Sequence, residues 1–196
     1  MEKNTITFIT GNQKKADYVA RYLGFPVDHL KLDLDELQSL DLRVIVAHKL
    51  QQAYEKIHSP VLVEDVSLEF AALGRLPGPF IRFFIDEVPM DTLCSLVSKD
   101  RKATARCVYG YTDGKRQEFF EGKLEGTIAE HPAGDNGYGF DKIFIPDGYA
   151  VAWLEAASSH VQCYGRALGY AGRHQMVGTG RLDSELPERA NRPIVY

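Results

Sequence analysis

The feature that most constrains this chain is a strand, a tight turn and a helix near its amino terminus. Thr5–Thr10 alternates apolar and polar side chains and is rich in β-branched residues, which predicts a strand. Gly11 and Asn12 interrupt this pattern, and Lys14–Leu23 then carries apolar residues at helical spacing. A strand that leads directly into a helix is the unit from which α/β sheets are built, so we expect an α/β fold.

The turn between this strand and helix is suited to binding an anion. Backbone N–H groups and the positive end of the helix dipole face any group held there, and Lys14 and Lys15 add positive charge. The turn has neither the GxGxxG nor the GxxxxGK[ST] spacing. A Rossmann or P-loop assignment is therefore excluded.

The stretch Val61–Phe84, VLVEDVSLEFAALGRLPGPFIRFF, is the second constraint. It opens with the apolar run Val61–Val63, and we expect that strand to end at the adjacent acids Glu64 and Asp65. Ligands of open α/β sheets bind at the carboxyl ends of strands. Mg²⁺ usually takes one or two carboxylates and lets a substrate phosphate supply further oxygens. On this segment alone, a metal site and a strand end with solvated acids both remain open.

The other segments complete the predicted fold. We expect further strands at Leu30–Leu34, Ala103–Thr112, Arg116–Leu124 and Ile143–Ile145, and helices at Leu42–Ile57 and Pro89–Ser98. Asp113-Gly114 is a strong hairpin signal. Early alternation of strands and helices followed by an antiparallel hairpin predicts an α/β protein with a mixed sheet. We expect the hairpin region to form a second lobe, with the ligand cleft between the lobes.

Length and composition limit the partners and the compartment. The 196 residues suit one domain, which we place at residues 1–177, and residues 178–196 form an extension of unknown role. The net charge of −4 argues against a general nucleic-acid binder. Three widely spaced cysteines suggest free thiols, and neither a signal peptide nor a membrane span is evident. We expect a cytoplasmic protein without a membrane partner.

Five segments, in order and at similar spacing, match one known family. They are TGNQKK at Thr10–Lys15, the segment around Glu36, LVEDVSL at Leu62–Leu68, GRLPGPFIRFF at Gly74–Phe84 and GYGFDKIFIPDGY at Gly137–Tyr149. Together they make the chain resemble the inosine triphosphate pyrophosphatase family from Thr5 to Tyr149. The resemblance implies two α/β lobes around a long mixed sheet flanked by helices, a deep cleft and a homodimer.

The resemblance also implies a reaction. Members of this family are Mg²⁺-dependent hydrolases of nucleotide metabolism. They split a nucleoside triphosphate, preferably a deaminated purine such as ITP, XTP or dITP, into the monophosphate and pyrophosphate. The alternative function for this chain is a non-catalytic nucleotide-binding or sensor protein derived from such enzymes. Retention of both acids and the phosphate-binding lysines favours the enzyme.

Matching positions carry over the family's residue roles. Glu36 and Asp65 match the metal-binding acids, with Glu64 beside them, and Asp65 and Lys15 are the implied catalytic residues. Asp65 would orient or deprotonate the attacking water. The substrate-binding set implied by the match is Thr10, Gly11, Asn12, Lys15, Lys49, Arg82, Tyr138, Gly139, Phe140 and Asp141. Arg82 stands where lysine is common, and Phe140 is either a stacking partner for a purine or a core aromatic.

The family's next motif is altered. A lysine-asparagine pair and a serine-histidine-arginine run normally hold the 6-keto purine, and here residues 155–168 lack that lysine. One alignment puts Gln162-Cys163-Tyr164 in the serine-histidine-arginine positions. The other keeps Ser159-His160 but places Val161 at the arginine. Base preference is therefore open to change, and the residues that could restore it are Arg166, Arg173 and His174.

Overall fold

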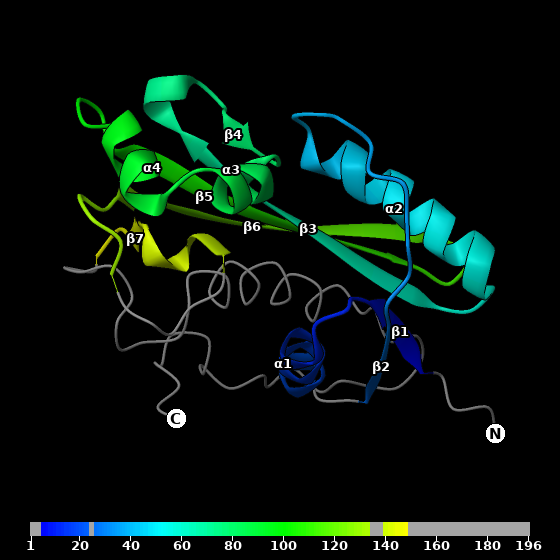
Figure 1. Cartoon of the computed structure of the whole chain (residues 1–196). Coiled ribbons are helices and arrows are strands. Elements are labelled where there is room, and N and C mark those ends of the chain that lie inside the picture. The colour runs from blue at the N-terminus through cyan, green and yellow to red at the C-terminus, as the bar shows by residue number, and fades with distance from the viewer. Residues whose placement is uncertain (1–4, 24–25, 134–138, 149–196) are drawn as a thin grey trace. The chain divides into compact units, whose positions relative to one another are not determined.

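The computed structural model describes residues 5–23, 26–133 and 139–148 (Figure 1). The described elements are, in chain order, β1 Ile6–Ile9, α1 Gln13–Leu23, β2 Val27–Leu30, α2 Leu42–Ile57, β3 Val61–Phe70, η1 Ala71–Leu73, β4 Pro77–Gly78, α3 Ile81–Glu87, α4 Met90–Leu96, β5 Lys102–Thr112, β6 Gln117–Ile128, η2 Gly139–Lys142 and β7 Phe144–Pro146. None of the described helices has the length and apolar character needed to cross a membrane.

The strands form one mixed sheet. Among the described residues it has seven strands in the order β2-β1-β3-β5-β6-β7, and β4 pairs with β3. β1 is parallel to both β2 and β3, whereas β3–β4 and β6–β7 are antiparallel. The prediction of an α/β fold with a mixed sheet flanked by helices is confirmed.

The chain divides into two compact units. The described part of the first unit comprises residues 5–23, 26–65 and 108–121, and that of the second comprises residues 66–107, 122–133 and 139–148. The predicted cleft between two lobes and the proposed boundary at residue 177 stay predictions.

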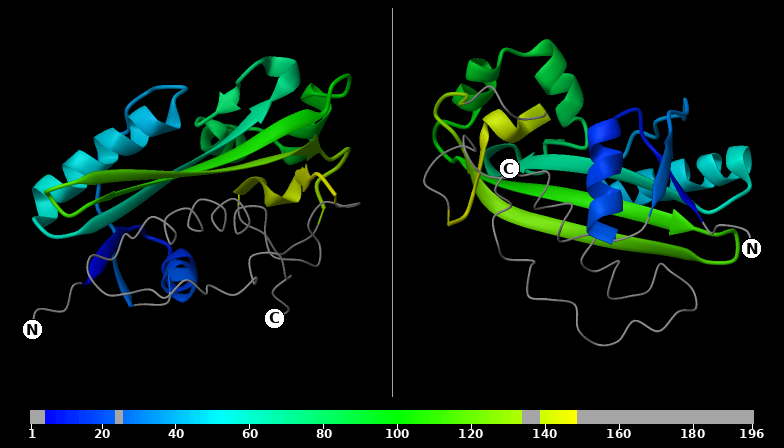
Figure 2. Two further views of the ribbon diagram at one scale, coloured as in Figure 1. Left: turned by 180° about the vertical axis from the view of Figure 1, so that it is seen from behind. Right: turned by 90° about the horizontal axis from the view of Figure 1, so that it is seen from below.

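In the first unit, α1 and α2 cover opposite faces of the parallel strands (Figures 1 and 2). The buried side of α2 contacts Val61 and Val63 of β3. Side chains alternate along a strand, so Leu62 faces the other side, where its register partner Phe8 is also fully buried. Continuous burial on both faces explains why Val61–Val63 is an unbroken apolar run.

The hairpin of β5 and β6 turns where the sequence predicts. Gly114 has φ +85°, and an added Cβ would lie 1.8 Å from the Tyr54 hydroxyl oxygen of α2. Asp113 Oδ1 accepts hydrogen bonds from the backbone N–H groups of Lys115 and Arg116. Burial acts to raise the pKa of Asp113, but these two hydrogen bonds, together with the charge of Arg116 and a hydrogen bond from the backbone of Asp113 itself, hold that pKa below its ordinary value.

In the second unit, Arg101 ties helix α4 to strand β6. Its Nη1 donates to the carbonyl oxygens of Cys94 at 3.1 Å, Ile128 at 3.3 Å and Ala129 at 2.8 Å. β7 then pairs with the end of β6, where Gly126 lies opposite Pro146. A Cβ at Gly126 would lie 2.2 Å from the Ile145 carbonyl oxygen, so this close approach requires glycine.

Two predicted boundaries are wrong. β3 does not end at Glu64 and Asp65 but continues to Phe70, because its later residues regain buried positions and pair with β4. The strand expected at Leu30–Leu34 lies earlier, at Val27–Leu30, where it pairs with β1. Residues 31–41, which we call the Glu36 loop, have no regular structure.

Candidate active site

The turn after β1 is organised by its own side chains. Asn12 caps α1, since its Oδ1 accepts from the Lys15 backbone N–H at 3.2 Å. The Asn12 N–H donates to Thr10 Oγ1 at 3.1 Å, and the Thr10 N–H donates to the Leu30 carbonyl at 3.0 Å. The cap fixes the direction in which α1 leaves the turn and places Lys15 in its first turn.

Lys15 forms the first of two ion pairs with the acids of β3. Its Nζ lies 2.6 Å from Glu64 Oε1, and the two side chains are 18% and 10% exposed. The end of β1 is close in the sheet, because Phe8 is the register partner of Leu62. Glu64 therefore lies just beyond the residues that β1 and β3 pair, beside the turn that begins at Thr10.

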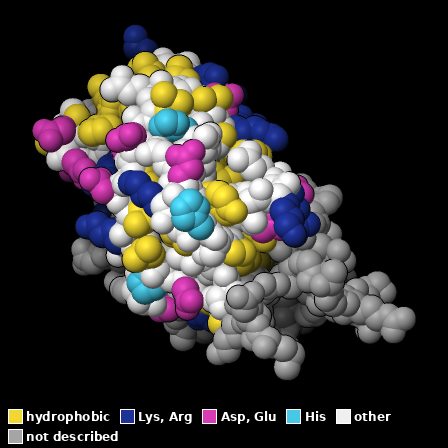
Figure 3. Space-filling model, turned by 90° about the vertical axis from the view of Figure 1, so that its right-hand side faces the viewer, with side chains coloured by type: hydrophobic (Ala, Val, Ile, Leu, Met, Phe, Trp, Pro, Cys, Tyr) yellow, Lys and Arg dark blue, Asp and Glu magenta, His cyan; other side chains and the backbone are white. Residues whose placement is uncertain are grey.

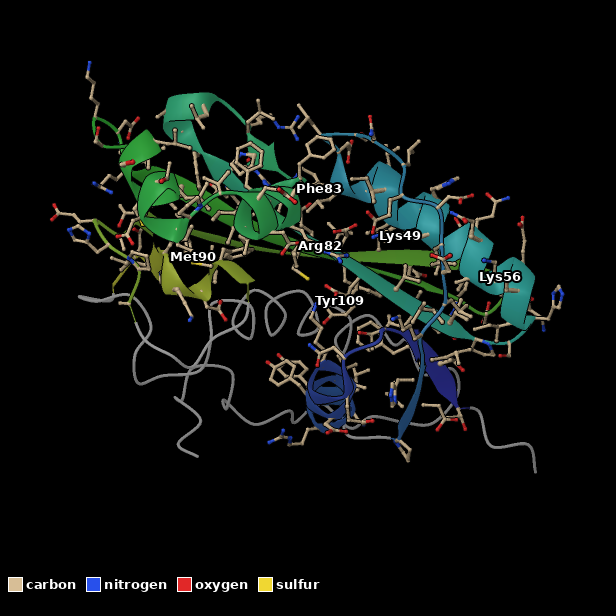
Figure 4. The ribbon with its side chains drawn as sticks, viewed as in Figure 1. Lys49, Lys56, Arg82, Phe83, Met90 and Tyr109 are labelled. Atoms are coloured by element: carbon tan, nitrogen blue, oxygen red, sulfur yellow. The ribbon has the colours of Figure 1, made fainter. Side chains whose placement is uncertain are left out.

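Lys49 forms the second pair, with a further acid nearby. Its Nζ lies 2.7 Å from Asp65 Oδ2 and 3.9 Å from Glu36 Oε1. Lys49 belongs to α2, where Figure 4 labels it. The next residue of the helix, Leu50, is buried. The helix thus brings a cation to the point where β3 and the Glu36 loop each supply a carboxylate.

The two ion pairs lie on opposite faces of β3. Asp65 follows Val61 and Val63 on the side covered by α2, whereas Glu64 follows Leu62 on the side of α1. Within the described residues, no three Asp, Glu, His or Cys side chains gather as a metal cluster. Glu64 is therefore not seen together with Glu36 and Asp65 as a three-acid site, because adjacent residues of a strand point in opposite directions.

One row of α2 side chains holds the Glu36 loop in place. Gln52 Oε1 accepts from the Asp35 backbone N–H at 2.9 Å, and Gln52 Nε2 donates to the Asp35 carbonyl at 3.1 Å. One turn later, Lys56 Nζ donates to the Asp33 carbonyl at 2.5 Å. Figure 4 labels Lys49 and Lys56, the two ends of this row. Positions 49, 52 and 56 share one helix face, so a single face of α2 positions the loop and Glu36.

Lys31 is a neighbour of the turn that sequence reasoning missed. Its Cδ and Cγ lie 3.2 Å and 3.4 Å from where a Cβ on Gly11 would be. Its stem therefore covers the glycine of the turn. No signal for it was present in the sequence, because the strand predicted at Leu30–Leu34 contains Lys31, whereas β2 ends at Leu30.

The remaining predicted residues with described side chains lie in the second unit. Arg82, in α3, is 77% exposed and pairs with Asp86 at 3.5 Å (Figure 4). Phe140 is only 2% exposed, and its ring meets Phe144 edge-on with centroids 6.3 Å apart. Phe140 is thus buried against another aromatic ring in this structure, and its stacking on a purine stays a prediction. Asp141 is also buried, at 2% exposed.

Several predicted residues lie outside the described part of the chain. These are Tyr138, the two alternative alignments around residues 159–164, and Arg166, Arg173 and His174. Gly139 is described and begins η2 with φ +63°.

Neither of the two described cysteines resembles a nucleophile. Cys94 and Cys107 are both fully buried. Burial, assisted by the charge of Asp91, raises the pKa of the Cys94 thiol. A raised pKa leaves little Cys94 thiolate near neutrality, so this thiol is poorly suited to act as a nucleophile.

Comparison with known sequences gives consistent results. The model of the Ham1 family matches residues 6–167. A protein from Scheffersomyces stipitis named inosine triphosphate pyrophosphatase is 36% identical over 169 residues, covering 78% of this chain and 86% of its own. One of the same name from Schizosaccharomyces pombe is 38% identical, covering 77% and 82%, and inosine triphosphate pyrophosphatase 2 of Trypanosoma cruzi is 40% identical, covering 72% and 75%.

Solved structures show the same fold. The Ham1 protein of Staphylococcus aureus aligns with a TM-score of 0.73 at 22% identity, over 87% of this chain and 97% of its own. A HAM1 protein from Coxiella burnetii aligns with a TM-score of 0.75 at 21% identity, over the same shares. At these identities the likeness concerns the fold alone.

Proposed function

Because the chain belongs to the Ham1 family, we propose that it hydrolyses nucleoside triphosphates to the monophosphate and pyrophosphate, acting on deaminated purine nucleotides. Relatives named inosine triphosphate pyrophosphatase are 36%, 38% and 40% identical over most of their lengths. The single observation that carries the proposal is the pair of lysine–carboxylate contacts where β3 passes the turn after β1. Lysines and acids placed together can bind a triphosphate and supply oxygens for its metal ion.

The phosphate chain is assigned to the turn and the lysines. Backbone N–H groups at the start of α1 suit an anion, Lys15 lies in the first turn of that helix, and the stem of Lys31 packs over Gly11. Lys49, in the same unit, supplies a further cation beside Asp65. On the face in Figure 3, basic and acidic side chains are interspersed among apolar ones.

Mg²⁺ fits the acids on the α2 side of β3. Glu36 and Asp65 both approach the Lys49 ammonium, at 3.9 Å and 2.7 Å, so both carboxylates already lie within reach of one shared positive charge. Two carboxylate ligands completed by phosphate oxygens and water is the usual protein site for this ion. When bound there, Mg²⁺ neutralises charge on the phosphates and makes a water more acidic.

We assign to Asp65 the role of orienting and deprotonating the attacking water. It is the more shielded of the two acids, with its side chain 17% exposed against 58% for Glu36. A shielded carboxylate beside the phosphates can orient a water for attack and accept its proton. Arg82 and the base-pocket segment 138–141 stay candidate substrate contacts.

A panel of triphosphates tests the proposal. Purified protein is incubated with ITP, XTP, dITP, GTP and ATP, with Mg²⁺ or with a chelator, and pyrophosphate and monophosphate are measured. We expect pyrophosphate release that needs Mg²⁺ and is highest for deaminated purines. Binding of these nucleotides without release of pyrophosphate would instead identify the non-catalytic sensor.

We further propose a cytoplasmic homodimer in which residues 1–177 form the catalytic domain. Support for the compartment is compositional, since the cysteines are few and widely spaced, and Cys94 and Cys107 are not joined in a disulfide. Light scattering of the purified protein tests the dimer. Truncation after residue 177 tests the boundary, because a complete domain retains its thermal unfolding transition and its activity.

A further inference from the structure

The Lys49 ammonium lies within ion-pair distance of both acids that we assign to the metal. Its contact with Asp65 is short, at 2.7 Å, and Glu36 lies at 3.9 Å. The Lys49 and Asp65 side chains are each 17% exposed, so water screens their attraction only in part. A lysine ammonium has three donors and no acceptor, and it therefore satisfies carboxylates in the way a metal ion would.

We infer that Lys49 is the counter-ion of the Glu36–Asp65 pair in the metal-free protein and releases it when metal and triphosphate bind together. This inference rests on the proposed function, because it takes the metal acids and the triphosphate from there. Mg²⁺ on these carboxylates repels an ammonium only a few ångströms away, so binding of the ion favours displacement of Lys49. A triphosphate bound nearby offers Lys49 a new anionic partner.

Cooperativity between metal and substrate follows. Free Mg²⁺ has to break the Lys49–Asp65 contact, and the Lys49 ammonium is then left without a negatively charged partner. Mg²⁺ that arrives with a triphosphate brings the anion that accepts the ammonium. By linkage, whatever the triphosphate adds to metal affinity, the metal adds equally to triphosphate affinity. Lys49 is therefore the residue that makes the site select the magnesium–nucleotide complex over the free ion.

The chain supplies a matched control on the other face of β3. Lys15 pairs with Glu64 at 2.6 Å, with side chains 18% and 10% exposed, closely similar to the Lys49–Asp65 pair. Glu64, the partner of Lys15, points toward α1 and away from Asp65. Removing Lys15 thus changes the net charge by the same amount without vacating the space between Glu36 and Asp65.

The test measures the affinity for Mg²⁺ alone, without nucleotide. Calorimetric titrations, supported by the Mg²⁺-dependent rise in Tm, compare wild type with Lys49→Met, Lys49→Arg and Lys15→Met. We expect Lys49→Met to bind Mg²⁺ about tenfold more tightly or better, which corresponds to about 1.4 kcal/mol. Lys49→Arg keeps the competing charge and should stay near wild type. Lys15→Met should shift the affinity by less than about threefold, because its charge lies on the far face.

An unchanged or weakened affinity in Lys49→Met overturns the inference, as does equal tightening in Lys15→Met. If Lys49→Met does not fold by circular dichroism, Lys49→Gln removes the charge while keeping a donor for Asp65, and the same outcomes apply. The readout is independent of turnover. The protein could lack pyrophosphatase activity while Lys49→Met still binds Mg²⁺ more tightly than wild type. That result would refute the proposed function and support the role of Lys49 as counter-ion.

Discussion

Asp65→Asn separates the chemical role of Asp65 from its part in the fold. The substitution keeps the shape of the side chain and removes its charge. At 2.7 Å from Lys49 Nζ, with both side chains 17% exposed, the charged pair has a gross attraction of about 6 kcal/mol at an effective dielectric constant near 20. Desolvation offsets most of this, so the net value of the contact is about 1.5–3 kcal/mol.

The fold should survive, and catalysis should not. The asparagine side-chain oxygen still accepts a hydrogen bond from the Lys49 ammonium, so we expect a loss of about 1–2 kcal/mol out of roughly 5–15 kcal/mol. The Tm should fall by about 2–8 °C. Without its carboxylate the site loses the proposed metal ligand and the proposed acceptor of the water's proton, so kcat should fall about 10²-fold or more.

A coupled pyrophosphate assay and a thermal melt by circular dichroism measure both quantities. The control is Asp35→Asn, which removes the same charge from the Glu36 loop. The contacts that hold residue 35 to Gln52 use its backbone, so the control should keep wild-type activity. An Asp65→Asn protein that melts cooperatively and retains activity within about threefold of wild type would remove Asp65 from the chemistry.

Four further outcomes are expected. Lys15→Ala should raise KM for ITP, dITP and GTP by similar factors, since the triphosphate is common to all; a loss confined to one base would contradict its assignment to phosphate. The ratio of kcat/KM for ITP over ATP should be of the order of tens and not thousands, because the segment 155–168 lacks the lysine that fixes a 6-keto group; a larger ratio means that other residues rebuild the pocket. Gln52→Ala should lower Mg²⁺-dependent kcat/KM about tenfold by releasing the Glu36 loop, while Gln51→Ala, whose amide donates to the exposed Glu55, stays near wild type. Gly126→Ala should cost about 1–3 kcal/mol in unfolding free energy by chemical denaturation, because its Cβ meets a backbone oxygen; an unchanged midpoint would show that β7 shifts freely.

The elements that bury a regular face were predictable from the sequence. α2 occupies Leu42–Ile57 as expected, because its apolar side chains recur at helical spacing and Asp41 caps its first turn. The β5–β6 hairpin follows from Asp113-Gly114 for a similar local reason. Periodicity and turn chemistry act over a few residues, so they leave a trace in the sequence that needs no knowledge of tertiary contacts.

What could not be predicted depends on partners distant in the chain. β3 extends past its two acids because β4 pairs with its far end, and the apolar pattern alone cannot reveal that pairing. The separation of Glu64 from Asp65 onto two faces follows from the strand continuing through them. Phe140 was ambiguous for the same reason, since only its contact with Phe144 shows that its ring is buried.

The anchoring of the Glu36 loop has a consequence for how this protein can vary. Gln52 and Lys56 form hydrogen bonds with the main chain of residues 35 and 33. These contacts do not involve the side chains of those two residues. The identity of those two aspartates is therefore of little importance to the shape of the loop, whereas the spacing along α2 is decisive. A single inserted residue between positions 49 and 56 would turn one anchor about 100° around the helix axis. Natural variation in this region should thus appear as substitutions in the loop and not as changes in the length of the helix.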